Sequence, residues 1–231
     1  MQHTTAILVF ARTAASEQLR KKLDKPGKQA IHNFLLKQTL TTVEATGIPY
    51  YLVDETLQKG DTFSKRLNNA FQEVFNLGYS HVMAVGSDCP QRTSEDLLLS
   101  RKLVERNNIC LGPDTHGGVH LLGLSKQIFE DGILDGISWN TARVFKQLTR
   151  FVKNENIQHQ SISVYADINN SADMLNLLNK ISLEKSLRQI LQQLLCYFIK
   201  LWSFVKPYFL PSFFSNSDLL RGPPTVLPSF L

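Results

Sequence analysis

Three short segments of the sequence hold side chains that could carry chemistry. Residues 85–90 (VGSDCP) end an apolar run in the carboxylate of Asp88, residues 112–118 (GPDTHGG) form a glycine-punctuated stretch, and residues 167–170 read DINN. Carboxylate and amide oxygens bind hard divalent cations, and such a cation offsets the charge of a diphosphate. Asp88 could therefore begin a metal-assisted site, which oxygen ligands from residues 167–170 could complete.

Each segment also has a purely structural interpretation. Asp88 could be a turn aspartate, residues 112–118 could be a tight hairpin, and Asn170 or Ser171 could cap a helix. In the functional interpretation, Gly117 and Gly118 let the backbone approach a ligand closely and leave amide groups free to bind it. The sequence alone leaves both interpretations open.

Two further groups of residues are candidates for ligand binding. Arg12, Arg20 and Lys22 follow the first apolar run and could hold phosphates, although a solvated basic helix face is an equal alternative. His116 and His120 stand four residues apart, but this spacing brings side chains together only on a helix, which disfavours zinc.

The elements that must position these residues alternate along the chain. Short apolar runs predict strands, and stretches with helical spacing lie between several of them. The predicted strands are residues 6–11, 48–53, 81–86, 108–112, 119–124 and 161–165, and the predicted helices are residues 30–45, 63–77, 94–106 and 141–153. This alternation predicts an α/β protein with a mostly parallel sheet and helices on both faces, in which ligands bind at the carboxyl ends of the strands.

Composition narrows the class of protein. The chain has 231 residues with 43% hydrophobic content, a net charge of +5 and three cysteines without a CxxC pair. These values favour one main domain, residues 1–182, in a reducing compartment. Because no secretory signal is visible, the predicted location is cytoplasmic. The sequence contains no zinc-finger spacing and no RNA-binding aromatic signature, so nucleic acid is not expected as a partner.

Residues 183–231 differ in character from the rest. An amphipathic stripe from Leu187 to Val205 predicts a helix, which Pro207 and Pro211 end before an irregular tail. Packing against the core, contact with a membrane surface and contact within a homo-oligomer are the roles left open for this helical extension.

Together and in this order, the segments resemble a bacterial family of glycosyltransferase-like proteins of the GT-A type, formerly of unknown function and related to small-molecule nucleotidyltransferases. The resemblance spans about residues 5–180. The matching runs are residues 10–13 (FART), 58–63 (QKGDTF), 66–67, 69–71, 86–90 (GSDCP), 112–113 with 117–118, 121–124 (LLGL), Trp139 with Thr141, and Asp167 with Asp173.

The resemblance implies a three-layer α/β/α fold that binds a nucleotide sugar or a nucleoside triphosphate with Mg²⁺ or Mn²⁺. Asp88 would be the metal-binding acid, with Asp167 or Asn169 as the second metal ligand, and Asp88 and His116 are the predicted catalytic residues. The predicted donor-binding residues are Arg12, Arg20, Lys22, Arg66, Gly117 and Gly118.

The chain departs from this family at a few positions. His116 stands where the family has aspartate, Ser64 where it commonly has glycine, and Ala14 and Glu17 replace residues of its first loop. The leading hypothesis is a metal-dependent glycosyl transfer from a nucleotide sugar to a small-molecule acceptor. Nucleotidyl transfer to a phosphorylated small molecule is the alternative reaction, and a relative that binds its ligand without catalysis is the third hypothesis.

Overall fold

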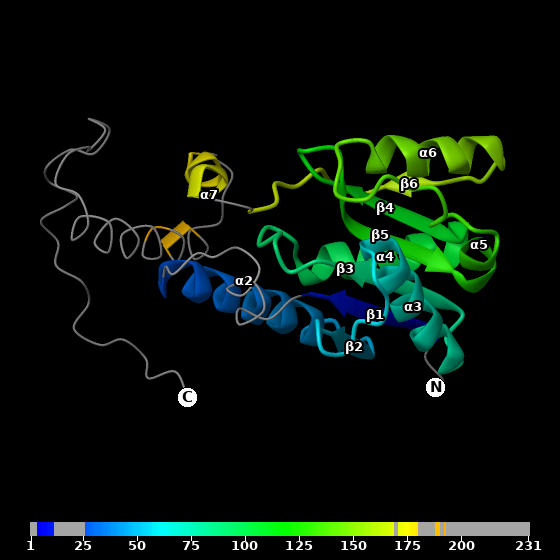
Figure 1. The fold of residues 1–231 in the computed structure, drawn as a ribbon, viewed down its shortest axis with the longest axis horizontal. Helices are drawn as coiled ribbons and strands as arrows, with labels where there is room; N and C mark the ends of the chain where they lie inside the picture. The colour runs from blue at the N-terminus through cyan, green and yellow to red at the C-terminus, as the bar shows by residue number, and fades with distance from the viewer. Residues whose placement is uncertain (1–3, 12–25, 169–170, 180–187, 190–191, 193–231) are drawn as a thin grey trace, which may run out of the picture.

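The computed structural model describes residues 4–11, 26–168, 171–179, 188, 189 and 192. Its central element is a six-stranded sheet of order β2-β1-β3-β5-β4-β6 (Figure 1). The strands are β1 (Thr5–Phe10), β2 (Tyr50–Val53), β3 (His81–Val85), β4 (Ile109–Pro113), β5 (Val119–Ser125) and β6 (Gln160–Ser161). Every neighbouring pair is parallel except the two that involve β5, which runs antiparallel to β3 and β4. The prediction of a mostly parallel sheet is confirmed.

Six helices accompany the sheet in the described part of the chain. They are α2 (Pro26–Glu44), α3 (Phe63–Asn76), α4 (Ser94–Asn107), α5 (Lys126–Glu130), α6 (Val144–Asn154) and α7 (Ser171–Leu178). Helix α4 begins in a capping box, in which Thr93 and Asp96 each bond the other's backbone amide.

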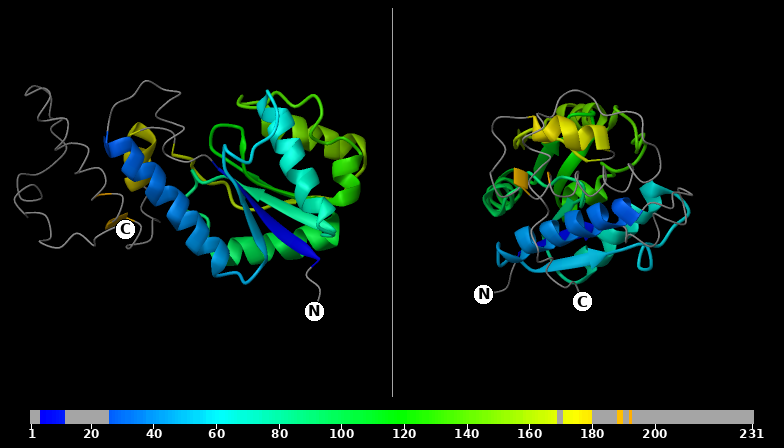
Figure 2. Two further views of the ribbon diagram at one scale, coloured as in Figure 1. Left: turned by 60° about the horizontal axis from the view of Figure 1, so that its bottom comes forward. Right: turned by 90° about the vertical axis from the view of Figure 1, so that its left-hand side faces the viewer.

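Helices cover both faces of the sheet, so the fold has three layers. On β1, Ala6 and Leu8 point into a cluster with residues of α3, α5 and α6, whereas Ile7 and Val9 point into a cluster with residues of α2 and α4. Successive residues of a strand face opposite sides, which is why a continuous apolar run suits a strand covered on both faces. Figure 2 (left) shows the sheet between α2 and α4 on one side and α3 and α6 on the other. The three-layer α/β/α prediction is confirmed.

Several boundaries differ from those expected. Helix α2 begins at Pro26 instead of residue 30, because proline suits the first turn of a helix, where its missing N–H is not needed. Helix α6 begins at Val144 instead of residue 141, because the Thr141 hydroxyl bonds the Ser138 carbonyl in a turn before the helix. The strand expected at 161–165 is reduced to the two residues of β6 and an isolated bridge between Asp114 and Tyr165.

None of the helices in the described part of the chain combines the length and the apolar character needed to cross a bilayer. The predicted C-terminal extension, residues 183–231, falls outside the described residues except at positions 188, 189 and 192. The division of the chain at residue 182 therefore stays a prediction.

Candidate functional site

Three loops meet at the edge of the sheet where β1, β3 and β4 end. Residues 86–92 follow β3, residues 114–118 join β4 to β5, and residues 165–168 follow β6. Backbone bonds connect them: the Ile168 amide donates to the Asp88 carbonyl at 2.8 Å, and the Thr115 amide donates to the Tyr165 carbonyl at 3.0 Å. The fold thus brings together loops that are up to about 80 residues apart in the sequence. They meet at the edge of the sheet where α/β proteins bind ligands. We refer to these three loops as the carboxyl-edge site.

Asp88 lies in a crowded, charged environment. Its carboxylate folds back over Gly86, where an added Cβ would come within 2.9 Å of Oδ1. Burial raises the pKa of the Asp88 carboxyl, and the negative charge of Asp167 raises it further. A carboxyl group with a raised pKa, close to other acids, is typical of catalytic positions.

The turn after β4 is built around the carboxylate of Asp114. Its Oδ1 accepts hydrogen bonds from the amides of His116 at 2.7 Å and Gly118 at 2.8 Å. A Cβ at Gly118 would collide with the other oxygen, Oδ2 of Asp114. Glycine at this position therefore allows the carboxylate to pack directly on the turn, which is a structural role that also shapes the site.

Gly117 is required for a different reason. Its φ of +85° lies in the left-handed region, and an added Cβ would meet the carbonyl oxygen of Ala142. The Gly117 carbonyl in turn accepts from the Phe145 amide at 3.0 Å. Gly117 therefore holds the turn against residues 142–145, and that segment borders the carboxyl-edge site.

His116 and Asp167 form the shortest polar contact between two side chains of the site. His116 Nδ1 lies 2.6 Å from Oδ1 of Asp167, with the imidazole 55% exposed and the carboxylate 14% exposed. The hydrogen bond to Asp167 and its negative charge raise the pKa of His116, and the charges of Asp173 and Asp114 add to the effect. His116 is therefore more often protonated near neutral pH than a free histidine.

Asp114, His116 and Asp167 could together hold a metal ion. One ligand atom from each lies within 4.8 Å of the other two, which suits three ligands of a single ion. Two carboxylates and an imidazole form a donor set that fits Mn²⁺, whereas Mg²⁺ prefers oxygen alone. Asp88 is not one of the three, and Asp88 as a ligand stays a prediction.

The other predicted residues are placed as follows. Arg66 is half-buried in the first turns of α3, and its amide bonds the Thr62 carbonyl. Arg12, Arg20, Lys22 and Asn169 lie outside the described residues. His120 is buried, with Nε2 bonded to the Ser163 carbonyl at 3.0 Å, and does not join His116 in the metal group found among the described residues. The structure therefore does not support a zinc site formed by His116 and His120.

Sequence reasoning missed Arg92. Its side chain is only 3% exposed and donates to the carbonyl oxygens of His120 at 2.7 Å and Gly86 at 2.5 Å. It also missed the role of Gln58, whose side-chain amide donates a hydrogen bond to the carbonyl oxygen of Ala11 at 2.8 Å. A lone polar residue in a loop carries no periodic signal, and only the tertiary structure reveals that Arg92 is buried.

Cys89, the residue after Asp88, is not suited to be a nucleophile. Burial raises the pKa of the Cys89 thiol to about 12, so Cys89 is protonated at neutral pH and unsuited to nucleophilic attack.

Three aromatic side chains form a row: the ring centroids of Phe10 and Phe63 are 5.7 Å apart, and those of Phe63 and Trp139 are 5.5 Å apart. The Trp139 Nε1 group has no partner within the described part of the chain, although it is buried.

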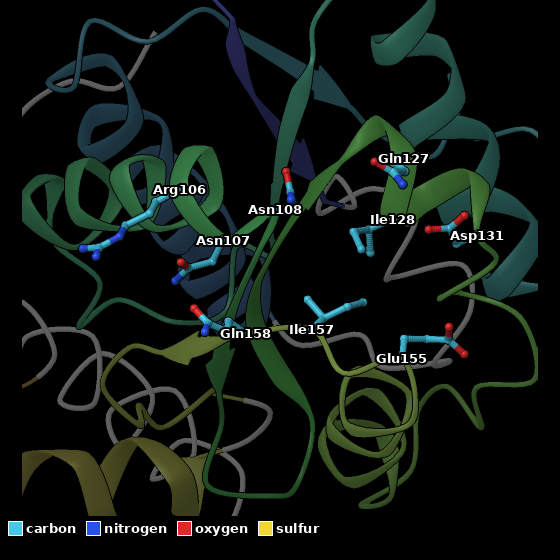
Figure 3. A pocket seen from close by; sticks show the side chains of 9 residues that line it. All are labelled: Arg106, Asn107, Asn108, Gln127, Ile128, Asp131, Glu155, Ile157 and Gln158. Atoms are coloured by element: carbon cyan, nitrogen blue, oxygen red, sulfur yellow. The ribbon is translucent and has the colours of Figure 1, made fainter.

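A hollow lies at the opposite edge of the sheet. It has a volume of about 440 Å³ and is lined mostly by polar and charged side chains. Figure 3 shows Arg106, Asn107 and Gln158 on one side of it, Gln127, Asp131 and Glu155 on the other, and Ile128 and Ile157 between them. Because these residues precede β4 and β6 or follow β5, the hollow is separate from the carboxyl-edge site.

Comparison with known proteins agrees with the resemblance seen in the sequence. Residues 52–141 match the model of a family described as "Uncharacterized protein conserved in bacteria (DUF2064)". The matched region carries Asp88, Asp114 and His116. No curated protein matches the chain.

Solved structures show the same fold. A protein of Desulfovibrio desulfuricans G20, provisionally named a nucleotide-diphospho-sugar transferase, has a TM-score of 0.73 at 20% identity, covering 87% of this chain and 97% of its own. Rv0371c of Mycobacterium tuberculosis H37Rv has a TM-score of 0.50 at 15% identity, covering 78% of this chain and all of its own. The 4-diphosphocytidyl-2C-methyl-D-erythritol synthase of Anaerococcus prevotii DSM 20548 also has a TM-score of 0.50, at 10% identity, covering 75% of this chain and 94% of its own.

Proposed function

We propose that this chain is a metal-dependent transferase that uses a nucleotide-activated donor, with glycosyl transfer from a nucleotide sugar as its leading reaction. The observation that carries the proposal is the convergence of Asp88, Asp114, His116 and Asp167 from three separate loops. Acidic groups held together at this edge would repel one another unless a cation or a protonated group lies among them. The likeness in fold to a provisional nucleotide-sugar transferase supports this choice of donor.

Asp114, His116 and Asp167 would hold the metal ion. When bound, a divalent ion stabilises the negative charge that develops on a leaving diphosphate. Asp114 is fixed for this role by the amides of His116 and Gly118, which orient its carboxylate without any side-chain rearrangement. The imidazole ligand favours Mn²⁺ over Mg²⁺. Asn169 as a further ligand stays a prediction.

Asp88 would receive the proton of the attacking acceptor hydroxyl. Its raised pKa makes its ionised form a stronger base than an ordinary aspartate, which suits this task. The glycine turn and the first turns of α3 with Arg66 would contact the donor, because both lie at the same edge of the sheet. Arg12, Arg20 and Lys22 remain the predicted phosphate-binding cations.

Nucleotidyl transfer is the second candidate reaction, favoured by the likeness in fold to the cytidylyl-transferring synthase of A. prevotii. The two reactions release different products. Glycosyl transfer or donor hydrolysis releases a nucleoside diphosphate from a nucleotide sugar, whereas nucleotidyl transfer releases pyrophosphate from a nucleoside triphosphate.

The test is to incubate the protein with Mn²⁺ and panels of nucleotide sugars and nucleoside triphosphates, and to measure both products. Release of nucleoside diphosphate that is lost in Asp167→Asn and kept in Asp131→Asn supports the leading reaction. Asp131 is the matched control because it is an aspartate that lines the hollow at the opposite edge. Pyrophosphate release alone would support the alternative. If neither product forms although nucleotides bind, the chain is a binding protein without transferase activity.

A further inference from the structure

Arg92 occupies an unusual place for a charged residue. Its guanidinium is almost completely withdrawn from water, and both of its side-chain hydrogen bonds within the described residues go to backbone carbonyls, those of Gly86 and His120. Burying a cation costs free energy, and burial indeed lowers the pKa of Arg92. A buried arginine that forms no close ion pair with a described carboxylate requires another reason for its position.

The two carbonyl partners lie at the ends of adjacent strands. Gly86 directly follows β3, and His120 is the second residue of β5, where Val85 pairs with Leu121. Arg92 therefore fastens the far end of loop 86–92 back onto the end of the β3–β5 pair. Because Arg92 lies six residues after Gly86, these bonds close the loop into a ring that contains Asp88.

The other side of the same loop binds the segment that carries Asp167. The Asp88 carbonyl accepts from the Ile168 amide at 2.8 Å, and the Gln91 side-chain oxygen accepts from the Ala166 amide at 3.2 Å. Loop 86–92 is thus fixed to the sheet by Arg92 and to residues 166–168 by Asp88 and Gln91. The position of Asp88 relative to Asp167 depends on both attachments.

Electrostatics gives the guanidinium a second effect. The charge of Asp167 acts against the ionised form of Asp88, and the charge of Arg92 acts in its favour. The carboxylate of Asp88 also packs on Gly86, whose carbonyl binds Arg92 directly. The buried cation can therefore offset part of the repulsion between the two acids while its hydrogen bonds go to backbone carbonyls.

We propose that Arg92 is a positioning residue that holds Asp88 opposite Asp167 in the carboxyl-edge site. It acts through Asp88 and does not contact the substrates. Its importance for turnover rests on the function proposed above, whereas its effect on the loop does not.

The test uses Arg92→Lys, which keeps the charge but loses the forked hydrogen bonding, and Arg92→Met, which loses both. Arg106→Met is the matched control, because Arg106 is exposed at the opposite edge of the sheet. Hydrogen exchange of the Ile168 amide reports the loop attachment, exchange of the Leu122 amide reports the sheet, and electron paramagnetic resonance reports the affinity for Mn²⁺.

We expect Arg92→Lys to fold and to accelerate exchange at Ile168 by ~10-fold, because a charge-assisted hydrogen bond of ordinary strength corresponds to about this factor. Exchange at Leu122 should change much less, and Arg106→Met should change neither amide. In a working transferase, kcat should fall by a similar factor while KM for the donor changes little, because Arg92 does not touch the donor. A purely structural role would not produce this split between kcat and KM.

Unchanged exchange at Ile168 in Arg92→Lys, or equal acceleration at Ile168 and Leu122, would overturn the proposal. If Arg92→Met fails to fold, Arg92→Lys still decides the question. If the natural chain neither binds Mn²⁺ nor turns over, the proposed function fails, yet exchange at Ile168 continues to test Arg92 separately.

Discussion

The two edges of the sheet differ in how their polar residues are held. At the carboxyl-edge site, Asp88, Asp114, His116 and Asp167 are linked through backbone amides and through one another, and the negative charge of Asp167 raises the pKa values of both Asp88 and His116. At the opposite edge, Arg106, Asp131 and Glu155 border a hollow of about 440 Å³. A fixed arrangement of interacting charges, and not the presence of a hollow, therefore distinguishes the candidate site.

Among substitutions at the two edges of the sheet, Asp88→Asn should have the largest effect, a loss of turnover. The amide cannot accept a proton, so kcat should fall by ~100-fold or more, the usual size of a general-base contribution. Affinity for Mn²⁺, measured by titration calorimetry, should stay within about threefold, because Asp88 is not one of the three proposed ligands. Asp131→Asn should leave both values unchanged.

A different result would revise the role of Asp88. Loss of Mn²⁺ affinity together with turnover would make Asp88 a metal ligand, as the sequence predicts. Unchanged turnover in a natural chain that is active would remove Asp88 from the catalytic residues altogether.

Gly118→Ala should produce an intermediate effect. The new methyl group would push the Asp114 carboxylate out of the turn, so Mn²⁺ affinity should fall by ~10-fold, comparable to the loss of a group that orients a metal ligand. The side chain of Asp114 can rotate away, so the melting temperature should change little. Gly136→Ala is the control for general destabilisation: an added Cβ there meets nothing within 4 Å, but the φ of +67° strains alanine, so the melting temperature should fall while Mn²⁺ affinity is kept. Equal Mn²⁺ affinity in the natural chain and Gly118→Ala would show that Asp114 does not bind the ion.

The smallest expected effect is a pH dependence of stability from His116. The pKa of His116 in the folded state lies above its unfolded value of 6.5, so its bond to Asp167 stabilises the fold fully below pH 6.5. That stabilisation disappears as the pH rises through the folded pKa. In metal-free buffer, the melting temperature of the natural chain should therefore exceed that of His116→Gln at pH 6 and approach it at pH 9.

Thermal unfolding at a series of pH values measures this difference. His159→Gln, a substitution at a histidine outside the site, should not reproduce it. A gap between the natural chain and His116→Gln that is constant from pH 6 to pH 9 would contradict the proposed charge interaction with Asp167.

The fold could be predicted well from the sequence because its central strands are covered on both faces. Such strands read as continuous apolar runs, and the amphipathic stripe of α3 gives an equally clear signal. The short helix α5 was missed because five residues show no helical period. The reversal of β5 was not predicted either, because a glycine-rich turn fits a hairpin and a ligand-binding loop equally well.

The site could be predicted only in part. The sequence pointed to the loops that hold Asp88, His116 and Asp167, since each follows an apolar run or a glycine-rich turn. It did not place Asp114 among the metal ligands, because nothing local shows that its carboxylate turns toward His116 and Asp167. Arg92 was missed for a similar reason: its burial depends on strands β3 and β5 that meet only in the folded chain.

The central claim is that a metal-dependent nucleotide site lies at the carboxyl edge of the sheet. The most direct measurement is a thermal-shift screen of nucleoside diphosphates, triphosphates and nucleotide sugars, with Mn²⁺, with Mg²⁺ and without metal, on the natural chain, Asp167→Asn and Asp131→Asn. The account predicts stabilisation by a nucleotide that requires metal, is greater with Mn²⁺ than with Mg²⁺, disappears in Asp167→Asn and persists in Asp131→Asn. Absence of any shift in the natural chain, or an equal shift in Asp167→Asn, would contradict it.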